Sequence, residues 1–226
     1  MGNEFVSAIK YLGDCILQVV YPFKEQCLIC EELTNKNNYL CDSCFNKMKF
    51  CDDKFSIVKN DKQYFYYSLA YYSNIISELI LRLKYKSDFD CATVLGELMA
   101  DLIVRNNICI DVITFVPATK AALRKRGYNQ SKLLAKAIGR KLKLRVVASL
   151  NKNRETKDQI GLNEEMRWKN ILGSYSLKNK VNLKNKEILL VDDVMTTGAT
   201  TFCCAEELIK GAAKNVIILT VAKSKI

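Results

Sequence analysis

The chain has 226 residues, enough for one large domain or for one domain plus a small module. Hydrophobic residues make up 49% and charged residues 26%, which excludes a disordered or fibrous protein, and the absence of histidine excludes hydrolases that use an imidazole as general base. The net charge of +11 is uneven: residues 120–186 hold nineteen Lys or Arg against four Asp or Glu, whereas residues 1–60 hold seven against eight. This basic band suits a polyanionic partner, either nucleic acid or a phosphorylated small molecule, and a solubilising lysine-rich surface is the alternative.

The first residues of the chain give no sign of a membrane anchor. Residues 16–23 are apolar, but this stretch is too short to span a bilayer and it follows Lys10 and Asp14. No basic segment leads into an apolar core and a small-residue cleavage site, as a signal peptide requires. We therefore expect no membrane span and a cytoplasmic location.

Two CxxC pairs, ten residues apart, come next in the chain. In a reducing compartment, cysteines favour metal ligation or burial over disulfides. Residues 24–60 show little apolar periodicity, which is typical of a small module stabilised by a metal. Two such pairs supply the four thiolates of a structural zinc site, and redox chemistry is the alternative. The predicted ligands of Zn²⁺ are Cys27, Cys30, Cys41 and Cys44.

The other cysteines receive two interpretations. Cys51 is either a spare metal ligand or a remnant of a further pair. The rest lie in apolar or helical contexts, where a free cysteine packs as a small apolar residue. The cysteines expected to pack in this way are Cys15, Cys91, Cys109, Cys203 and Cys204.

From residue 61 onward, strand patterns alternate with helix patterns. Apolar or aromatic runs predict strands at residues 64–72, 111–116, 187–191 and 215–221, with a weaker pattern at 144–149. Apolar residues three and four positions apart predict helices at residues 75–84, 94–105, 131–142 and 200–210. The alternation indicates an α/β domain with a mainly parallel sheet, whose ligands bind beyond the carboxyl ends of the strands.

The strand predicted at residues 187–191 runs directly into Asp192, Asp193 and a threonine-rich loop. Two adjacent carboxylates are costly to bury without partners, so they are expected to meet water, a cation or sugar hydroxyls. Gly198 permits a turn in which successive N–H groups converge at a helix start, which makes residues 196–200 a candidate phosphate-binding loop. A plain helix N-cap is the alternative, and it explains one threonine but not the paired acids.

This stretch, ILLVDDVMTTGATT, resembles the signature of type I phosphoribosyltransferases, enzymes that use phosphoribosyl pyrophosphate. The resemblance implies that the two acids contact the ribose 2- and 3-hydroxyls and that the loop holds the 5-phosphate, with Mg²⁺ bound alongside the pyrophosphate. The ligand-binding residues that it implies are Asp192, Asp193, Thr196, Thr197, Gly198, Ala199 and Thr200.

Two CxxC pairs that could bind zinc precede this domain, and in this arrangement the chain is similar to the ComF family, which is associated with bacterial competence and DNA uptake. The likeness covers nearly the whole chain and includes residues 20–22, 83–86, 116–117, 123–130 and 154–159, with Leu162, Arg167 and Asn170. It implies a type I phosphoribosyltransferase-like parallel sheet flanked by helices, at residues 61–226, behind a small four-cysteine zinc module at residues 1–60. Members often carry a further cysteine pair, of which only Cys51 remains here.

A basic segment after Pro117 supplies candidates for the pyrophosphate group. Guanidinium groups bind phosphate oxygens in bidentate fashion, so the arginines here are better candidates than the lysines around them. The alternative for residues 126–130 is a helix start, with Asn129 as N-cap and Tyr128 packed. The candidates for the anionic group are Lys120, Arg124 and Arg126, with Arg154 further along the chain.

Three functions follow as hypotheses. The first is a ComF-like competence protein that binds phosphoribosyl pyrophosphate and single-stranded DNA, with proteins of the DNA-uptake machinery as possible partners. Strand binding needs a cationic groove and stacking aromatics, which Tyr39, Phe45 and Phe50 could supply. The alternatives are an active phosphoribosyltransferase that releases pyrophosphate to a nitrogen nucleophile, and a regulator that senses phosphoribosyl pyrophosphate without turnover.

Overall fold

The computed structural model describes residues 26–34, 39–51, 53–154, 164–178 and 181–224. The chain divides into two compact units, residues 1–47 and 48–226. Residues 16–23, Cys15 and residues 155–163, which carry part of the family likeness, lie outside the described residues.

The first unit is built around its cysteines. The backbone N–H of Cys27 donates to the carbonyl of Glu32 at 2.8 Å, and that of Leu28 donates to the carbonyl of Tyr39 at 2.9 Å, which closes the loop of the first pair. Cys41 then caps the short helix α2 (Asp42–Asn46), because its side chain accepts a hydrogen bond from the N–H of Cys44. Both pairs therefore lie on tight turns.

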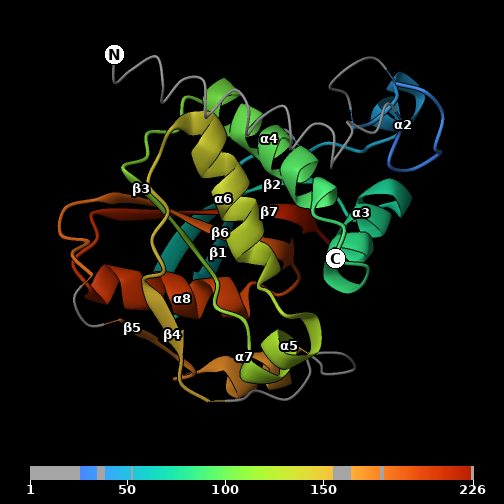
Figure 1. The fold of residues 1–226 in the computed structure, drawn as a ribbon. Coiled ribbons are helices and arrows are strands. Elements are labelled where there is room, and N and C mark those ends of the chain that lie inside the picture. The colour runs from blue at the N-terminus through green and yellow to red at the C-terminus, as the bar shows by residue number, and fades with distance from the viewer. Residues whose placement is uncertain (1–25, 35–38, 52, 155–163, 179–180, 225–226) are drawn as a thin grey trace, which may run out of the picture. The chain divides into compact units, whose positions relative to one another are not determined.

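The second unit contains a five-stranded sheet in the order β1-β2-β7-β6-β3 (Figure 1). Strands β2, β7, β6 and β3 are parallel to one another, and β1 forms an antiparallel hairpin with β2. The strands are β1 (Phe55–Lys59), β2 (Lys62–Tyr71), β3 (Val112–Phe115), β6 (Glu187–Met195) and β7 (Asn215–Lys223). The predicted α/β fold with a mainly parallel sheet is confirmed. Strand β1 was not predicted, and in the weak pattern at 144–149 only Val146 pairs, in an isolated bridge to Ile113.

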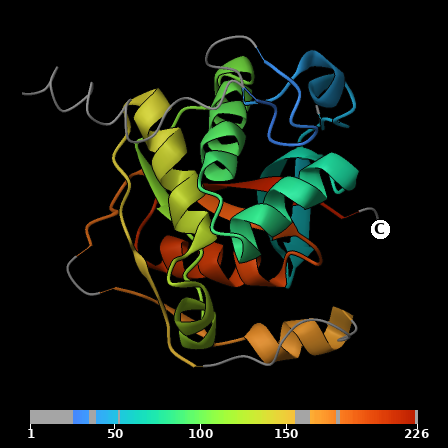
Figure 2. The same ribbon diagram turned by 45° about the vertical axis from the view of Figure 1, so that its right-hand side comes forward.

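Helices cover both faces of this sheet, which explains why β6 lacks polar alternation. Ile188 and Leu190 pack in one cluster with Phe202 and Leu208 of helix α8. Their neighbours Leu189 and Val191 are equally buried, and because strand residues alternate, they face the opposite side. Helices α4 and α6 lie side by side on that opposite side (Figures 1 and 2).

The helix bounds match the predicted helices to within a few residues. The four predicted helices are α3 (Asn74–Tyr85), α4 (Asp90–Arg105), α6 (Gln130–Leu142) and α8 (Ala199–Lys210). Two further helices, α5 (Lys120–Arg126) and α7 (Glu164–Ile171), and a small antiparallel sheet of β4 (Leu150–Lys152) and β5 (Tyr175–Leu177) complete the described structure. Figure 2 shows α7 apart from α4 and α6, on the α8 side.

Helices α4 and α6 approach closely because of a glycine. A Cβ atom at Gly96 of α4 would lie 2.4 Å from the Cβ of Ala137 on α6. The glycine therefore lets the two helices pack closely, and the first turn of α6 reaches the end of β6 through Gln130 and Ser131.

The remaining cysteines are mostly interior, as expected. Cys91, Cys203 and Cys204 are buried, but Cys109 is exposed, so its predicted packing role is wrong. Cys109 lies in the connection between α4 and β3, where its apolar neighbours Ile108 and Ile110 are themselves only half-buried. No helix in the described part of the chain has both the length and the apolar character needed to cross a membrane.

Candidate ligand cavity and cysteine cluster

Strand β6 is longer than the strand predicted at residues 187–191, and it includes both acids of the pair. The strand continues to Met195, and Asp192 and Val194 pair with Thr220 and Ala222 of β7. The two acids therefore belong to the last hydrogen-bonded part of the strand, where the backbone is fixed by its neighbour. Their side chains are held more rigidly than those of a loop.

The segment after β6 turns sharply into helix α8. Gly198 is the N-cap of α8 and has φ +77°, a left-handed conformation that favours glycine. A Cβ atom at this position would also lie 2.7 Å from Cδ1 of Ile57, on strand β1. Within the described residues, the N–H groups of Thr196, Thr197 and Gly198 have no hydrogen-bond acceptor. Amides of this kind at the start of a twelve-residue helix have the chemistry that suits an anion.

A cavity of about 760 Å³ opens at this carboxyl edge of the sheet. Its volume falls in the range of small-molecule sites. All seven residues predicted from the acid pair and the loop line it, namely Asp192, Asp193, Thr196, Thr197, Gly198, Ala199 and Thr200. The cavity is completed by residues from other elements, among them Tyr72, Lys84, Pro117, Thr119, Gln130, Lys152, Tyr175 and Ser224.

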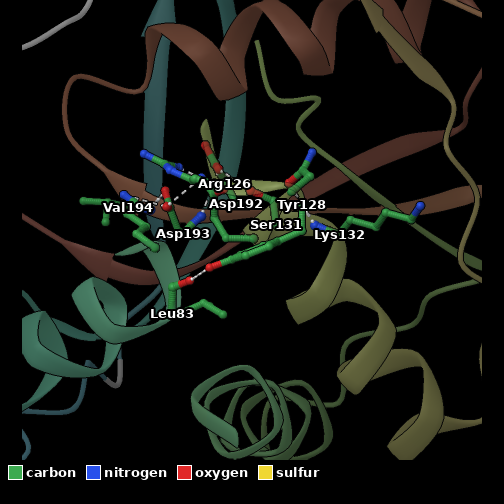
Figure 3. A network of polar contacts seen from close by, with 11 residues as sticks. Leu83, Arg126, Tyr128, Ser131, Lys132, Asp192, Asp193 and Val194 are labelled. Carbon is green, nitrogen blue, oxygen red and sulfur yellow. Dashed lines mark hydrogen bonds and ion pairs between the residues drawn. The ribbon is translucent and has the colours of Figure 1, made fainter. Parts of the chain in front are cut away.

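Asp193 is held by partners from three elements. Nζ of Lys84, at the end of α3, lies 2.6 Å from Oδ2 of Asp193. Nε2 of Gln130 donates to the same oxygen at 3.2 Å, and the N–H of Val194 donates to Oδ1 at 2.7 Å (Figure 3). Burial opposes ionisation of Asp193, but the Lys84 ammonium outweighs it and lowers the pKa of this carboxyl below its usual value.

Asp192 has different surroundings. Its Oδ1 accepts hydrogen bonds of 2.9 Å from Oγ of Ser131 and from the N–H of Asp193 (Figure 3). Burial and the adjacent charge of Asp193 raise the pKa of Asp192 to about 7. The two neighbouring acids are therefore electrostatically unequal, although their sequence positions look equivalent.

The basic residues predicted near the pyrophosphate lie outside the residues that line the cavity. Lys120, Arg124 and Arg126 are all on α5, and Lys120 and Arg124 are exposed. Arg126 reaches the cavity indirectly, since its Nη1 donates to Oε1 of Gln130 at 3.1 Å. Its guanidinium carbon lies 5.1 Å from the centre of the Tyr85 ring, in cation–π contact.

Residues 126–130 do form a helix start. Oδ1 of Asn129 accepts from the N–H of Lys132 at 3.1 Å, and Nδ2 of Asn129 donates to the carbonyl of Val116 at 2.9 Å. Tyr128 donates to the carbonyl of Leu83 and packs edge-on against Phe89. This interpretation is confirmed, and it explains how the chain brings Gln130 and Ser131 beside the acids.

Arg154 is engaged away from the lining of the cavity. Its Nε donates to Oγ of Ser174 at 3.0 Å, and its Nη2 donates to the carbonyl of Leu172 at 2.8 Å. These contacts tie the end of β4 to the turn after α7. In the described structure the guanidinium stabilises a backbone turn.

The sequence interpretation did not assign several residues that line the cavity. Lys84 and Gln130 were noted as parts of the family stretches 83–86 and 123–130, Gln130 also as part of a possible helix start, and Lys152 and Tyr175 were not singled out. The signal for Lys84 was its place in the last turn of a predicted amphipathic helix. Because its partner Asp193 lies more than a hundred residues away, only the fold pairs them.

The four predicted metal ligands form one cluster. The sulfur atoms of Cys27, Cys30, Cys41 and Cys44 all lie within 4.8 Å of one another. Backbone N–H groups point to them as well: that of Ile29 donates to Cys27 at 3.4 Å, and that of Cys44 donates to Cys41 at 3.4 Å.

The thiols of the cluster differ in their ionisation. Burial opposes ionisation of Cys27, but the N–H groups of Cys30, Cys41 and Ile29 outweigh it and lower the pKa of its thiol to about 6. Burial and the neighbouring thiols raise the pKa of Cys44. A divalent soft cation would remove this conflict by stabilising all four thiolates. Cys51 is buried in the second unit and is not part of the cluster.

These observations define a class: an α/β protein with a mainly parallel sheet, a cavity at the carboxyl edge of that sheet, and a four-cysteine cluster in its N-terminal unit. The chain is 30% identical over 155 residues to the DNA utilization protein YhgH of Escherichia coli O6:H1, covering 66% of this chain and 67% of that protein. The protein of the same name from Shigella flexneri is 29% identical over 155 residues, with the same coverage. The chain belongs to the family of these proteins.

No family model matches the chain, but several solved structures are similar to it. Adenine phosphoribosyltransferase of Trypanosoma brucei is similar with a TM-score of 0.46 and 10% identity, covering 76% of this chain and 86% of that one. Glutamine phosphoribosylpyrophosphate amidotransferase of Bacillus subtilis is similar with a TM-score of 0.43 and 20% identity, covering 62% of this chain and 30% of that one.

Proposed function

We propose that the chain binds phosphoribosyl pyrophosphate in the cavity at the carboxyl edge of the sheet. One observation carries the proposal: the acid pair of β6 and the N–H groups before α8 line the same cavity. A sugar phosphate has the matching chemistry, because its hydroxyls need acceptors and its phosphate needs donors.

The loop and the acids divide the ligand between them. The 5-phosphate lies against the N–H groups of residues 196–200, and the ribose hydroxyls lie near the acid pair. Mg²⁺ would accompany the pyrophosphate and neutralise part of its charge. Arg126 and the exposed Lys120 and Arg124 lie on α5, beyond the lining residues, and they raise the local positive potential.

Titration calorimetry with phosphoribosyl pyrophosphate and Mg²⁺ tests this assignment. We expect wild-type binding that weakens at least about tenfold when the loop is changed by Gly198→Ala, because the turn that directs the amides is lost. Glu97→Gln, at an exposed position on α4, is the matched control and should bind as wild type does. Absence of wild-type binding would refute the proposal. Pyrophosphate release in the presence of a nitrogen nucleophile would identify an active transferase instead of a binding protein.

We further propose that the chain contacts single-stranded DNA, as a ComF-like protein acting in DNA uptake. Support comes from the name of its relatives, DNA utilization protein, and from the basic excess of residues 120–186. A second cavity of about 410 Å³ lies at the amino edge of the sheet, at the starts of β3 and β6. Its rim carries the exposed side chains of Arg145 and Lys186, and its floor includes Val112 and Leu183. Phosphates suit the rim, and a base suits the apolar floor.

A salt titration of single-strand affinity tests the DNA role. We expect the double variant Arg145→Gln/Lys186→Gln to flatten the dependence of log affinity on log salt by about 0.7 for each lost phosphate contact. The double variant Lys59→Gln/Lys62→Gln, on the β1–β2 hairpin, is the matched control because it also removes two exposed positive charges, at least three strands away from β3. A wild-type affinity for single-stranded DNA that does not change with salt concentration would refute the proposed DNA role.

We propose zinc as the metal of the four-cysteine cluster, because four thiolates at these separations suit its tetrahedral coordination. The metal would be structural, since all four protein ligands are present and no position is left for a substrate. One equivalent of zinc per chain by atomic emission is the expected result. No zinc in chain purified without chelators would refute it.

A further inference from the structure

Two exposed aromatic rings lie where helix α3 meets helix α4. Tyr85 is the last residue of α3 and Phe89 is the N-cap of α4, and these residues are 56% and 51% exposed. An exposed ring forgoes the stabilisation that burial of its apolar surface would give. Single exposed rings are ordinary, whereas adjoining ones point to a surface that binds another molecule.

The fold holds both rings in place. Oδ2 of Asp88, in the connection between the two helices, accepts from Nη2 of Arg82 at 2.5 Å and from Nε of the same side chain at 3.0 Å. The hydroxyl of Tyr128 donates to the carbonyl of Leu83 on α3 (Figure 3). The Tyr128 ring also meets the Phe89 ring edge to face, with centroids 5.1 Å apart. A ligand that stacks on these rings therefore requires little ordering of the protein.

Cations from α5 adjoin the rings. The guanidinium carbon of Arg126 lies 5.1 Å from the centre of the Tyr85 ring, and Nζ of Lys125 lies 5.9 Å from it. Helix α5 carries four Lys or Arg in its seven residues and no acid. We define the aromatic platform as the three rings and the two cations beside them, namely Tyr85, Phe89, Tyr128, Lys125 and Arg126.

The charges around the aromatic platform favour a polyanion over a protein partner. Both acids of residues 74–89 have cationic partners: Oε1 of Glu78 lies 3.6 Å from Nζ of Lys86, and Asp88 pairs with Arg82. The positive potential of α5 is therefore not cancelled by these acids. Interfaces between proteins are enriched in aromatic residues but depleted in lysine, whereas sites for single-stranded nucleic acid combine aromatic rings with cations.

We propose that the aromatic platform binds single-stranded nucleic acid: bases stack on Tyr85 and Phe89, and Arg124 and Lys125 of α5 contact the phosphates. This assignment rests on the proposed single-strand binding, and it gives that function a stacking surface separate from the rim of the second cavity. Because every base has a face that can stack, the platform accepts single strands of any sequence. A duplex hides those faces, so the platform selects single strands.

The aromatic platform adjoins the cavity at the carboxyl edge of the sheet. Lys84, next to Tyr85 in sequence, lines that cavity, and Nη1 of Arg126 donates to Oε1 of Gln130, which also lines it. A strand stacked on the platform therefore lies beside the proposed phosphoribosyl site.

The test is an anisotropy titration of the whole protein with labelled oligothymidylate at several salt concentrations. Tyr85→Ala should weaken binding at least about fivefold at every salt concentration and leave the salt slope unchanged, because it removes stacking but no charge. Arg124→Gln/Lys125→Gln should instead flatten the slope by about 0.7 for each lost phosphate contact. Tyr85→Phe, which keeps the ring, should bind as wild type does.

Two controls separate stacking from loss of charge or fold. Phe65→Ala removes another exposed ring, 41% exposed on β2 with Nζ of Lys54 at 3.8 Å from its centre, and it should leave strand affinity unchanged. Inorganic polyphosphate has charge but no bases, so Tyr85→Ala should bind it as wild type does. Thermal unfolding confirms that each variant is folded.

A second readout detects stacking directly. In Tyr85→Trp the introduced indole should lose fluorescence when oligothymidylate binds, because a stacked base quenches it. Phe65→Trp is the matched control and should show no such change. Each is compared with wild type, whose single tryptophan supplies the background signal.

The outcomes distinguish the platform from the DNA role as a whole. A wild type that does not bind oligothymidylate overturns both. Wild-type binding that Tyr85→Ala leaves unchanged, or that Phe65→Ala weakens equally, overturns the platform and leaves the DNA role to the second cavity. Loss of self-association in sedimentation of Tyr85→Ala, with strand affinity unchanged, would assign the rings to a contact between copies of the chain and overturn the proposal.

Discussion

The two units of the chain are stabilised by different forces. In the first, the described residues bury few apolar side chains, chiefly Leu28 and Leu40, and four thiols lie within 4.8 Å of one another. In the second, helices on both faces of a five-stranded sheet bury a continuous apolar core. Small modules without such a core are commonly stabilised by a metal, whereas a domain with a continuous apolar core is stabilised mainly by the burial of apolar surface.

The two units also differ in the partners of their ionisable side chains, which are thiols in the first unit and the acid pair in the second. The four thiols of the first unit lie close to one another, an arrangement that suits the binding of a soft divalent cation. The acids of the second unit find Lys84, Gln130 and Ser131 within the fold. The polar groups beside the cavity are therefore held in place by contacts within the chain.

The largest effect is expected from removal of the metal. Structural zinc contributes about 10–16 kcal/mol in zinc-finger peptides, so a strong chelator should unfold the first unit completely. Cys41→Ser should do the same, while Cys109→Ser, at an exposed cysteine outside the cluster, should not. Hydrogen exchange resolved along the chain measures this. Loss of protection in the sheet would contradict the independence of the two units.

Truncation of a core side chain in the second unit should destabilise that unit and leave the metal content of the first unit unchanged. Leu134 of α6 is fully buried, and Leu134→Ala is expected to lower the free energy of unfolding by about 2–5 kcal/mol through the cavity it leaves. Leu81→Ala, at a 42% exposed position on α3, is the matched control and should cost less than about 1 kcal/mol. Denaturant unfolding gives the values, and bound zinc should stay unchanged in both variants.

A single methyl group added in the loop before α8 should lower the free energy of unfolding. Gly198→Ala combines a left-handed backbone with a Cβ contact of 2.7 Å to Ile57, and we expect a loss of about 1–3 kcal/mol. Gly127 has a similar φ of +80° but open space around it, so Gly127→Ala is expected to cost only about 1 kcal/mol. The difference in unfolding free energy isolates the contact with Ile57. Equal losses would show that crowding by β1 is unimportant.

The smallest effect concerns the pH dependence of stability. Because the pKa of Asp192 is raised to about 7, the folded protein holds this proton more tightly than the unfolded chain does, and stability falls as pH rises from about 4 to 7. Asp192→Asn removes this decline, so relative to wild type it should gain about 1–2 kcal/mol between pH 4.5 and pH 8. Unfolding curves at several pH values measure the difference. A constant offset between the two proteins would contradict the raised pKa.

Much of the site could be predicted because its signals are local. The apolar run, the acid pair, Gly198 and the next helix are adjacent in sequence, and so are the members of each CxxC pair. Lys84 and Ile57 could not be found in this way, since they meet Asp193 and Gly198 only through the packing of α3 and β1. Cys109 shows the same limit, since its apolar neighbours in sequence gave no sign that this connection is exposed in the fold.

A crystal structure of the protein with phosphoribosyl pyrophosphate and Mg²⁺ would examine the carboxyl-edge cavity directly. We expect the 5-phosphate against the amides of residues 196–200, a ribose hydroxyl within hydrogen-bond distance of the acid pair, and the Lys84–Asp193 ion pair intact. Ligand density at another place, or an empty cavity under saturating ligand, would contradict the proposed site.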